Sequence, residues 1–129
     1  MENQRQNYRQ RFEPEETLRV ELQLPGKRIV VSGELLDLSL GGMKLSLLNP
    51  PTELQSGKSV TARLVGRDAA HPVSLDLVLP SRVVYLRPHE ATVHCGLRFL
   101  PSASANANEA IERALSRFLL NEQRRKRSV

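Results

Sequence analysis

The chain has 129 residues, a hydrophobic fraction of 40% and a single cysteine, which favours one domain and excludes an internal disulfide framework or a Cys-rich zinc site. Its formal net charge of +5 is concentrated at the two ends of the sequence, which suits an anionic partner without identifying one. No apolar run approaches the ~20 residues of a membrane span, and the polar N-terminal residues lack the apolar segment of a secretory signal. We therefore expect a cytoplasmic protein.

Residues 1–16 are polar and show no sustained hydrophobic period, so we expect a flexible, arginine-bearing arm. From residue 17 to 24, hydrophobic and polar residues alternate, which predicts a half-buried strand. Pro25-Gly26 then predicts a tight turn, because proline fixes φ and glycine readily adopts positive φ. A second strand is expected from about Arg28 to Leu38, and a third from Met43 to Leu47.

The same alternation predicts further strands, at residues 60–64, 73–79 and 93–99. Pro80 interrupts the run before residues 83–86, which are therefore either a continuation after a kink or a separate strand. Short strands separated by glycine and proline are typical of a small antiparallel barrel or sandwich. We favour a β-barrel over residues 17–100, because closure removes exposed strand edges.

After Pro101 the hydrophobic period becomes helical, and the apolar positions of this stretch are Ile111, Leu115, Phe118 and Leu119. This spacing predicts a helix from Ala107 to about Gln123. Asn106, followed three residues later by Glu109, fits a capping box. We expect the segment 101–129, helix and basic tail together, to pack on or beside the barrel.

Two short motifs carry the functional prediction. Arg5-Gln6-Asn7-Tyr8-Arg9 places two arginines four residues apart in the arm, and Asp37-Leu38-Ser39-Leu40-Gly41-Gly42 ends the second predicted strand. The chain resembles the PilZ domain family of bacterial cyclic di-GMP receptors, in which these motifs read RxxxR and D/N-x-S-x-x-G. The order of arm, strands and C-terminal helix, with a GxxF at 96–99, extends the resemblance over nearly the whole chain. It implies a six-stranded antiparallel barrel flanked by a helix.

The resemblance also implies the ligand, cyclic di-GMP, and its site: Arg5, Arg9, Asp37, Ser39, Gly41 and Gly42. Guanidinium groups form paired hydrogen bonds with phosphate oxygens or guanine edges and stack on bases. A carboxylate can accept hydrogen bonds from guanine N1–H and N2–H₂, a serine adds a short hydroxyl, and glycines allow positive φ and close backbone approach. We expect the arginines to dominate affinity and Asp37 with Ser39 to select the base.

Three further residues are possible additional contacts: Gln4, Arg11 and Arg98. Gln4 immediately precedes the first arginine. In related domains the residue at this position influences whether cyclic di-GMP binds as one molecule or as a stacked pair. Instead of contacting the ligand, Arg11 could form an ion pair with nearby glutamates at the surface. Arg98 faces outward by alternation and reaches the ligand only if its strand adjoins the second motif; a surface salt bridge is the alternative.

The expected function is a stand-alone cyclic di-GMP receptor or adaptor that orders its arm on binding and changes its surface for an unidentified protein effector. We expect that the protein is not an enzyme and that it binds no metal ion and no cofactor, with cyclic di-GMP as its ligand. His71, His89 and His94 show no ligand spacing, and Cys95 is in phase with core positions, as a small buried hydrophobe would be.

Other interpretations remain open from the sequence. Arg5 and Arg9 alone also fit a solvated basic tail, and Asp37 to Gly42 alone fit a hairpin turn with a local side-chain hydrogen bond. The alternative function is a basic protein- or nucleic-acid-interaction module without specific dinucleotide binding. Nucleic acid is the less favoured partner, because the few aromatic residues are scattered and form no stacking platform. A third possibility is a degenerate family member that binds only protein.

Overall fold

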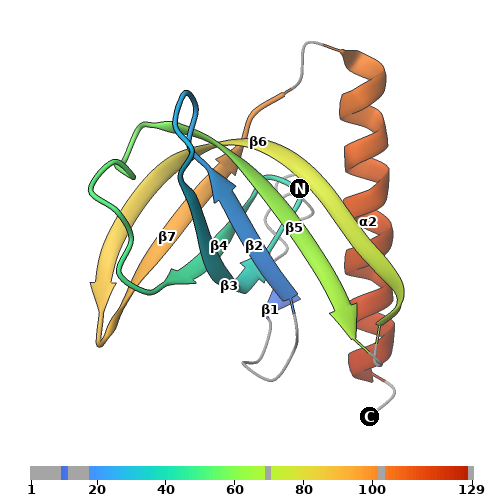
Figure 1. Cartoon of the computed structure of the whole chain (residues 1–129). Coiled ribbons are helices and arrows are strands. Elements are labelled where there is room, and N and C mark those ends of the chain that lie inside the picture. Colours follow the sequence, from blue (N-terminus) through green and yellow to red (C-terminus); the bar gives the residue numbers. More distant parts are fainter. Residues whose placement is uncertain (1–9, 12–17, 69–70, 102–103, 128–129) are drawn as a thin grey trace, which may run out of the picture.

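The computed structural model describes residues 10–11, 18–68, 71–101 and 104–127. Figure 1 shows them as a β-barrel with one long helix standing at its side. The elements are β1 (Gln10–Arg11), β2 (Leu18–Gln23), β3 (Val30–Leu38), β4 (Gly42–Leu47), β5 (Ser59–Asp68), β6 (His71–His89), β7 (Thr92–Phe99) and helix α2 (Ala105–Arg127).

Six of these strands close into an antiparallel barrel. Its order is β3-β2-β5-β6-β7-β4, and β4 pairs back with β3 to complete the circle. The two-residue strand β1 lies outside this circle and pairs with the last residues of β3. The predicted six-stranded antiparallel barrel with a C-terminal helix is therefore confirmed.

The fifth predicted strand and residues 83–86 form one continuous strand, β6. Pro80 sits inside its ladder opposite Thr61, and the Pro80 carbonyl accepts a hydrogen bond from the Leu100 N–H at 2.8 Å. The register against β7 shifts between Val83 and Tyr85, so the irregularity lies four residues beyond the proline. Of the two alternatives left open by the sequence, the continuation is correct.

The core is built mainly from leucine and valine, as the scarcity of aromatic residues predicts. Leu22, Leu45 and Leu64 are fully buried inside the barrel. Leu115 and Leu119 of α2 join the same cluster with at most 6% of their surface exposed. Since burying such a side chain contributes ~1.5–3 kcal/mol, α2 is part of the folded unit rather than an appendage.

Helix α2 begins earlier than the sequence pattern suggests. Its first residue is Ala105, and the hydroxyl of Ser104 accepts a hydrogen bond from the Ala107 N–H at 3.3 Å. This is the geometry of an N-terminal serine cap. The prediction that Asn106 caps the helix is wrong, because Asn106 already lies in the first helical turn. In the described part of the chain, no helix is long and apolar enough to cross a lipid bilayer.

Candidate functional site

A bulge at the end of β3 determines where Asp37 points. Along β3, Val31 and Leu35 are buried in the barrel, and strict alternation would aim residue 37 inward as well. The β3–β4 register shifts between Leu35 and Asp37, so Leu36 is an extra residue. Leu38 takes the interior position and is fully buried, while Asp37 is half-buried. The bulge thereby keeps a carboxylate out of the apolar core, where burial is costly.

Ser39 holds the turn that follows. Its N–H donates to the Gly42 carbonyl at 2.9 Å. Its hydroxyl oxygen accepts from the N–H groups of Gly41 and Gly42, at 3.2 and 3.3 Å, and donates to the Gly42 carbonyl at 3.4 Å. Only 5% of the Ser39 surface is exposed. A hydroxyl has one donor and two acceptor sites, so all of its hydrogen-bonding capacity is directed into the turn.

The two glycines of the turn meet different surroundings. A Cβ at Gly42 would collide with the Leu97 carbonyl of β7, whereas no atom lies within 4 Å of a Cβ at Gly41. The Gly41 carbonyl accepts a hydrogen bond from the Phe99 N–H at 2.9 Å. Glycine allows positive φ, but neither of these two glycines adopts it. Gly42 is required for close packing of the turn on β7, and Gly41 leaves backbone open to solvent.

Strand β1 joins the N-terminal segment to this turn. Gln10 pairs with Leu38 and Arg11 with Asp37, so the two residues of the expected arm that the structure describes lie beside the second motif. Arg9 immediately precedes Gln10 in the sequence. Gln4, Arg5 and Arg9 lie outside the described residues, as does the side chain of Arg11.

Arg98 lies next to the turn. In the β4–β7 ladder it pairs with Gly42, and its side chain is exposed. The condition that its strand adjoin the second motif is therefore met. Across β6–β7, Arg98 pairs with Arg82, and across β3–β4, Lys44 pairs with Asp37. Alternation along their strands indicates that the side chains of Lys44 and Arg82 face outward. Their position beside the turn follows only from the order of the strands in the barrel.

This part of the barrel is strongly cationic. The strands β4 and β7 and residues 77–89 of β6 contain no Asp or Glu, and they carry Lys44, Arg82, Arg87 and Arg98. We call these four residues the cationic face. Such a face raises the local concentration of a small anion.

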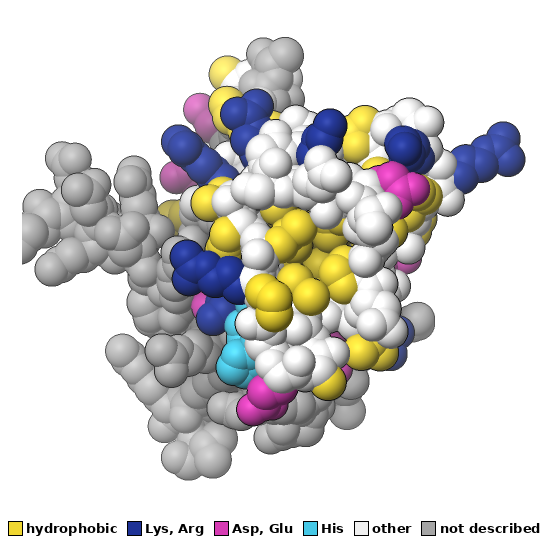
Figure 2. Space-filling view, turned by 90° about the vertical axis from the view of Figure 1, so that its left-hand side faces the viewer, with side chains coloured by type: hydrophobic (Ala, Val, Ile, Leu, Met, Phe, Trp, Pro, Cys, Tyr) yellow, Lys and Arg dark blue, Asp and Glu magenta, His cyan; other side chains and the backbone are white. Residues whose placement is uncertain are grey.

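Two histidines stack near the other end of β7. The rings of His89 and His94 are 4.1 Å apart between centroids, and Figure 2 shows histidine side chains between basic residues above and an acidic one below. Burial lowers the pKa of His94 below its ordinary value of 6.5, and the nearby charges of His89 and Lys44 lower it further, while Glu90 opposes them. Burial raises the pKa of Cys95 to about 12, which leaves its thiol unreactive. Among the residues with described positions, no group of three or more His, Cys, Asp or Glu side chains could hold a metal ion.

Comparison with known proteins identifies the fold family. A family model described as PilZ domain matches residues 3–117. The structure is similar to the PilZ domain with c-di-GMP of YcgR from Escherichia coli, with a TM-score of 0.69 and 20% identity over 94% of this chain and 92% of that one. It is also similar to the PilZ domain of CeSA from a cellulose-synthesizing bacterium, with a TM-score of 0.60 and 22% identity over 86% of this chain and 97% of that one. A third similar structure is MrkH of K. pneumonia in its apo state, with a TM-score of 0.63 and 16% identity over 91% of this chain and 52% of that one. At these identities the structural likeness shows the fold alone. A comparison with curated protein sequences finds no match.

Proposed function

Because the chain belongs to the PilZ domain family, we propose that it is a receptor for cyclic di-GMP that signals through a protein partner. The observation that carries this proposal is the junction of β1 with β3. Arg11 pairs with Asp37, so the chain that leads to Arg9 and Arg5 joins β1 beside the second motif. A structural relative, the PilZ domain of YcgR, was solved with c-di-GMP.

The ligand is a dianion with two guanines, and the proposed residues match both features. Arg5 and Arg9 bind phosphate oxygens or guanine O6 and N7 through paired hydrogen bonds. The Asp37 carboxylate accepts from guanine N1–H and N2–H₂, which adenine does not offer. Arg98, which flanks the turn at Gly42, adds attraction for the phosphates from the barrel side.

The residues of the turn act mainly by positioning. Since the Ser39 hydroxyl is engaged inside the turn, we assign it the role of holding the backbone in shape for the ligand. Gly42 lets the turn pack on β7, and Gly41 presents uncovered backbone. Asp37 is then the residue of this motif that selects guanine.

The mechanism that we propose is closure of the arm. Without ligand, the like charges of Arg5, Arg9 and Arg11 repel one another; the two phosphates neutralise them and draw the arm onto the barrel. Ordering costs ~1–2 kcal/mol per fixed backbone residue. The pairing of Gln10 and Arg11 with β3 lowers this cost, because these two residues need no further ordering. The closed arm forms a surface that the free protein lacks, and this surface binds the protein partner.

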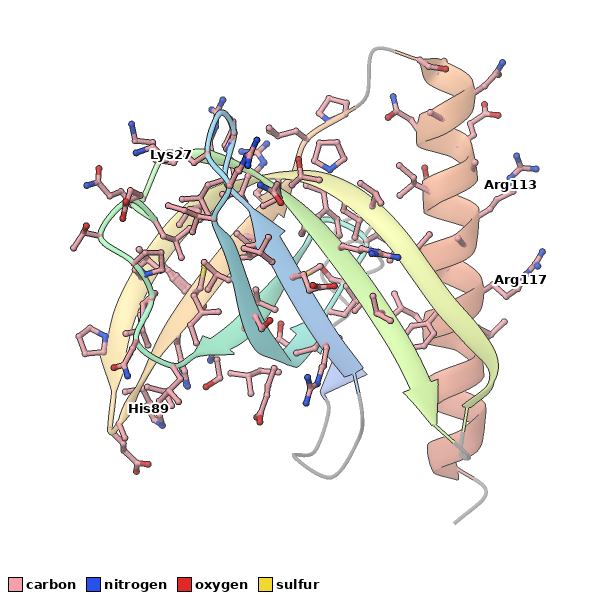
Figure 3. All side chains as sticks on the ribbon, in the orientation of Figure 1. Lys27, His89, Arg113 and Arg117 are labelled. Atoms are coloured by element: carbon pink, nitrogen blue, oxygen red, sulfur yellow. The ribbon has the colours of Figure 1, made fainter. Side chains whose placement is uncertain are left out.

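Titration calorimetry of the full chain with cyclic di-GMP tests the proposal, with Arg9→Ala as the diagnostic variant. Loss of a charged, paired contact costs ~1.5–3 kcal/mol, so we expect affinity to fall by about tenfold to more than a hundredfold. Arg113→Ala is the matched control, because Figure 3 shows Arg113 pointing away from the barrel. The measured stoichiometry distinguishes one bound ligand from a stacked pair.

The outcomes separate the candidate functions. A receptor binds cyclic di-GMP in preference to cyclic di-AMP and GTP. A basic interaction module binds all three weakly, discriminates little and loses affinity steeply with salt. Equal affinity of wild type and Arg9→Ala would remove Arg9 from the site, and absence of cyclic di-GMP binding by the wild type would overturn the receptor function.

A further inference from the structure

The outer wall of the barrel carries positive charge at the end of β7 that lies away from the candidate turn. In the ladder between β6 and β7, His94 pairs with Arg87. His94 is four residues from Arg98, or about 13 Å along the strand, so this region is separate from the turn. We call it the histidine end of the cationic face, and its residues are Lys44, Arg87, His89 and His94.

An aromatic ring holds Arg87 in position. The guanidinium carbon of Arg87 lies 4.7 Å from the centroid of the Tyr85 ring, and a Cβ at Gly96 would collide with that same ring. Cation–π stacking uses the flat face of a guanidinium group and leaves the N–H groups at its edge for a carboxylate. In the described part of the chain, Arg87 forms no ion pair with an acidic residue. Its side chain is exposed and can therefore receive an anion.

His94 senses charge at the same place. Burial is the largest cause that lowers its pKa, followed by the charges of His89 and Lys44, while Glu90 raises it. Arg87 faces His94 in register from β6. A carboxylate brought to this end would offset the repulsion among these cations, because a nearby opposite charge favours the charged imidazole. Binding of an acid and protonation of His94 would then favour one another.

The surroundings favour an acidic peptide over a nucleic acid. Strands β4 and β7 and residues 77–89 of β6 contain no Asp or Glu that would repel carboxylates. Bases of single strands stack on free aromatic rings, whereas the Tyr85 ring is already engaged by Gly96 and Arg87. Val84, next to Tyr85 in the bulge of β6, exposes 56% of its surface. It offers an apolar contact that a peptide side chain can match.

We propose that the histidine end of the cationic face is a docking surface for an acidic peptide segment of a protein partner. Arg87 forms paired hydrogen bonds with one carboxylate, and protonated His94 and Lys44 attract its neighbours. Outward-facing residues repeat at about 7 Å along an extended chain, so a segment in which every second residue is acidic matches this wall. The inference goes beyond the receptor function and does not depend on it, because it uses none of the residues proposed to bind cyclic di-GMP.

Titration of the ligand-free full chain with a synthetic peptide of alternating Glu and Ser tests this docking surface. A peptide of alternating Gln and Ser is the uncharged control. We expect Arg87→Ala to weaken binding of the Glu peptide by at least about fivefold. Arg87→Lys should restore only part of it, because lysine keeps the charge but lacks the planar fork. Arg113→Ala removes the same charge from the outer side of α2 (Figure 3) and should leave the affinity nearly unchanged.

The ring of His94 gives an independent readout. Affinity for the Glu peptide should rise as the pH falls through the pKa of His94, and an NMR titration should show that the bound peptide raises this pKa. His94→Gln should flatten the pH dependence of peptide binding, whereas Arg113→Ala should preserve it.

Each outcome bears on a different part of the inference. Equal peptide affinity of wild type and Arg87→Ala, or a His94 pKa that the peptide leaves unchanged, would overturn the location. Tighter binding of a single-stranded DNA oligonucleotide or of anionic phospholipid vesicles, lost in Arg87→Ala, would overturn the acidic peptide as occupant. Failure of the Glu peptide to bind would overturn the inference and leave the receptor function intact, since that function is measured with cyclic di-GMP. Peptide binding by a chain that does not bind cyclic di-GMP would support the inference without the receptor function.

Discussion

Gly41 and Gly42 are neighbours in sequence, yet substitution should affect them very differently. Gly42→Ala would push a methyl group against the Leu97 carbonyl, whereas the same change at Gly41 meets open space at an unstrained φ. Overpacking of this kind costs ~1–3 kcal/mol. We expect Gly42→Ala to lower the free energy of unfolding by that amount and Gly41→Ala to change it by no more than ~0.5 kcal/mol.

Urea unfolding of the two glycine variants measures the difference. Because a displaced turn also displaces Asp37, cyclic di-GMP affinity should fall together with stability in Gly42→Ala. Equal stability of the two variants would show that the turn does not depend on its contact with β7.

His94 should make the stability of the fold depend on pH. Its pKa in the folded protein lies below the ordinary value of 6.5 because of burial, His89 and Lys44. Between the pKa of His94 in the folded protein and its ordinary value, the unfolded chain therefore binds more protons than the folded one. We expect stability to be full above pH 6.5 and to fall as pH drops through the folded pKa of His94.

Two substitutions near His94 should move its pKa in opposite directions. His89→Gln removes a cause that lowers the pKa, so the pKa should rise; Glu90→Gln removes a cause that raises it, so the pKa should fall. An NMR titration of the His94 ring in each variant measures both shifts. Shifts of the same sign in the two variants would contradict this account of the cluster.

At the scale of the elements, the cap of α2 offers a test against the sequence-based assignment. Ser104→Ala removes the hydroxyl that accepts the Ala107 N–H, and loss of a serine cap costs ~1 kcal/mol. Asn106→Ala, at the residue that the capping-box pattern selects, should leave stability nearly unchanged, because Asn106 lies within the first turn. The free energies of unfolding from urea titrations measure both changes. A larger loss at Asn106 than at Ser104 would return the cap to the predicted position.

The strands were largely predictable, and their irregularities were not. Alternation identified β2, β4 and β7 to within a residue or two, because each strand has one face in the core. β6 is continuous through Pro80 because β5 pairs with the residues before and after this proline. β7 pairs with the residues that follow it. The bulge at Leu36 likewise appears only when β4 sets the register. Sequence alternation describes one strand at a time, and these features belong to pairs of strands.

At the scale of the whole molecule, the candidate site is assembled from segments far apart in the sequence. Asp37, Ser39 and Gly42 were identifiable because they form a local motif. The positions of Lys44 and Arg82 beside that motif follow from barrel closure, which no local pattern encodes. The sequence predicted that the arm meets the second motif, but it did not predict that Arg11 pairs with Asp37. The predicted ligand contacts of Arg5 and Arg9 stay predictions.

The cationic face should make ligand binding depend on salt and on Arg98. Two unit charges about 4 Å apart in water attract by ~1 kcal/mol, so Arg98→Ala should weaken cyclic di-GMP binding by at least about fivefold. It should also flatten the dependence of affinity on salt concentration. Arg113→Ala, which removes the same charge from the outer side of α2 (Figure 3), is the control. Calorimetry at several salt concentrations measures both; identical behaviour of the two variants would exclude Arg98 from the site.

The short ladder between β1 and β3 also has a kinetic and evolutionary consequence. With Gln10 fixed opposite Leu38, Arg9 is one peptide unit from the fixed point and Arg5 is within about 18 Å of it. Under the proposed function, a ligand bound at the turn would meet these two arginines at an effective concentration in the millimolar range expected for short linkers, so their contacts with it would form intramolecularly. Lengthening the chain between Arg9 and Gln10 would dilute them without altering any contact. If the proposed function holds, insertions or deletions at this one joint would retune sensitivity to cyclic di-GMP while the proposed binding residues stay the same.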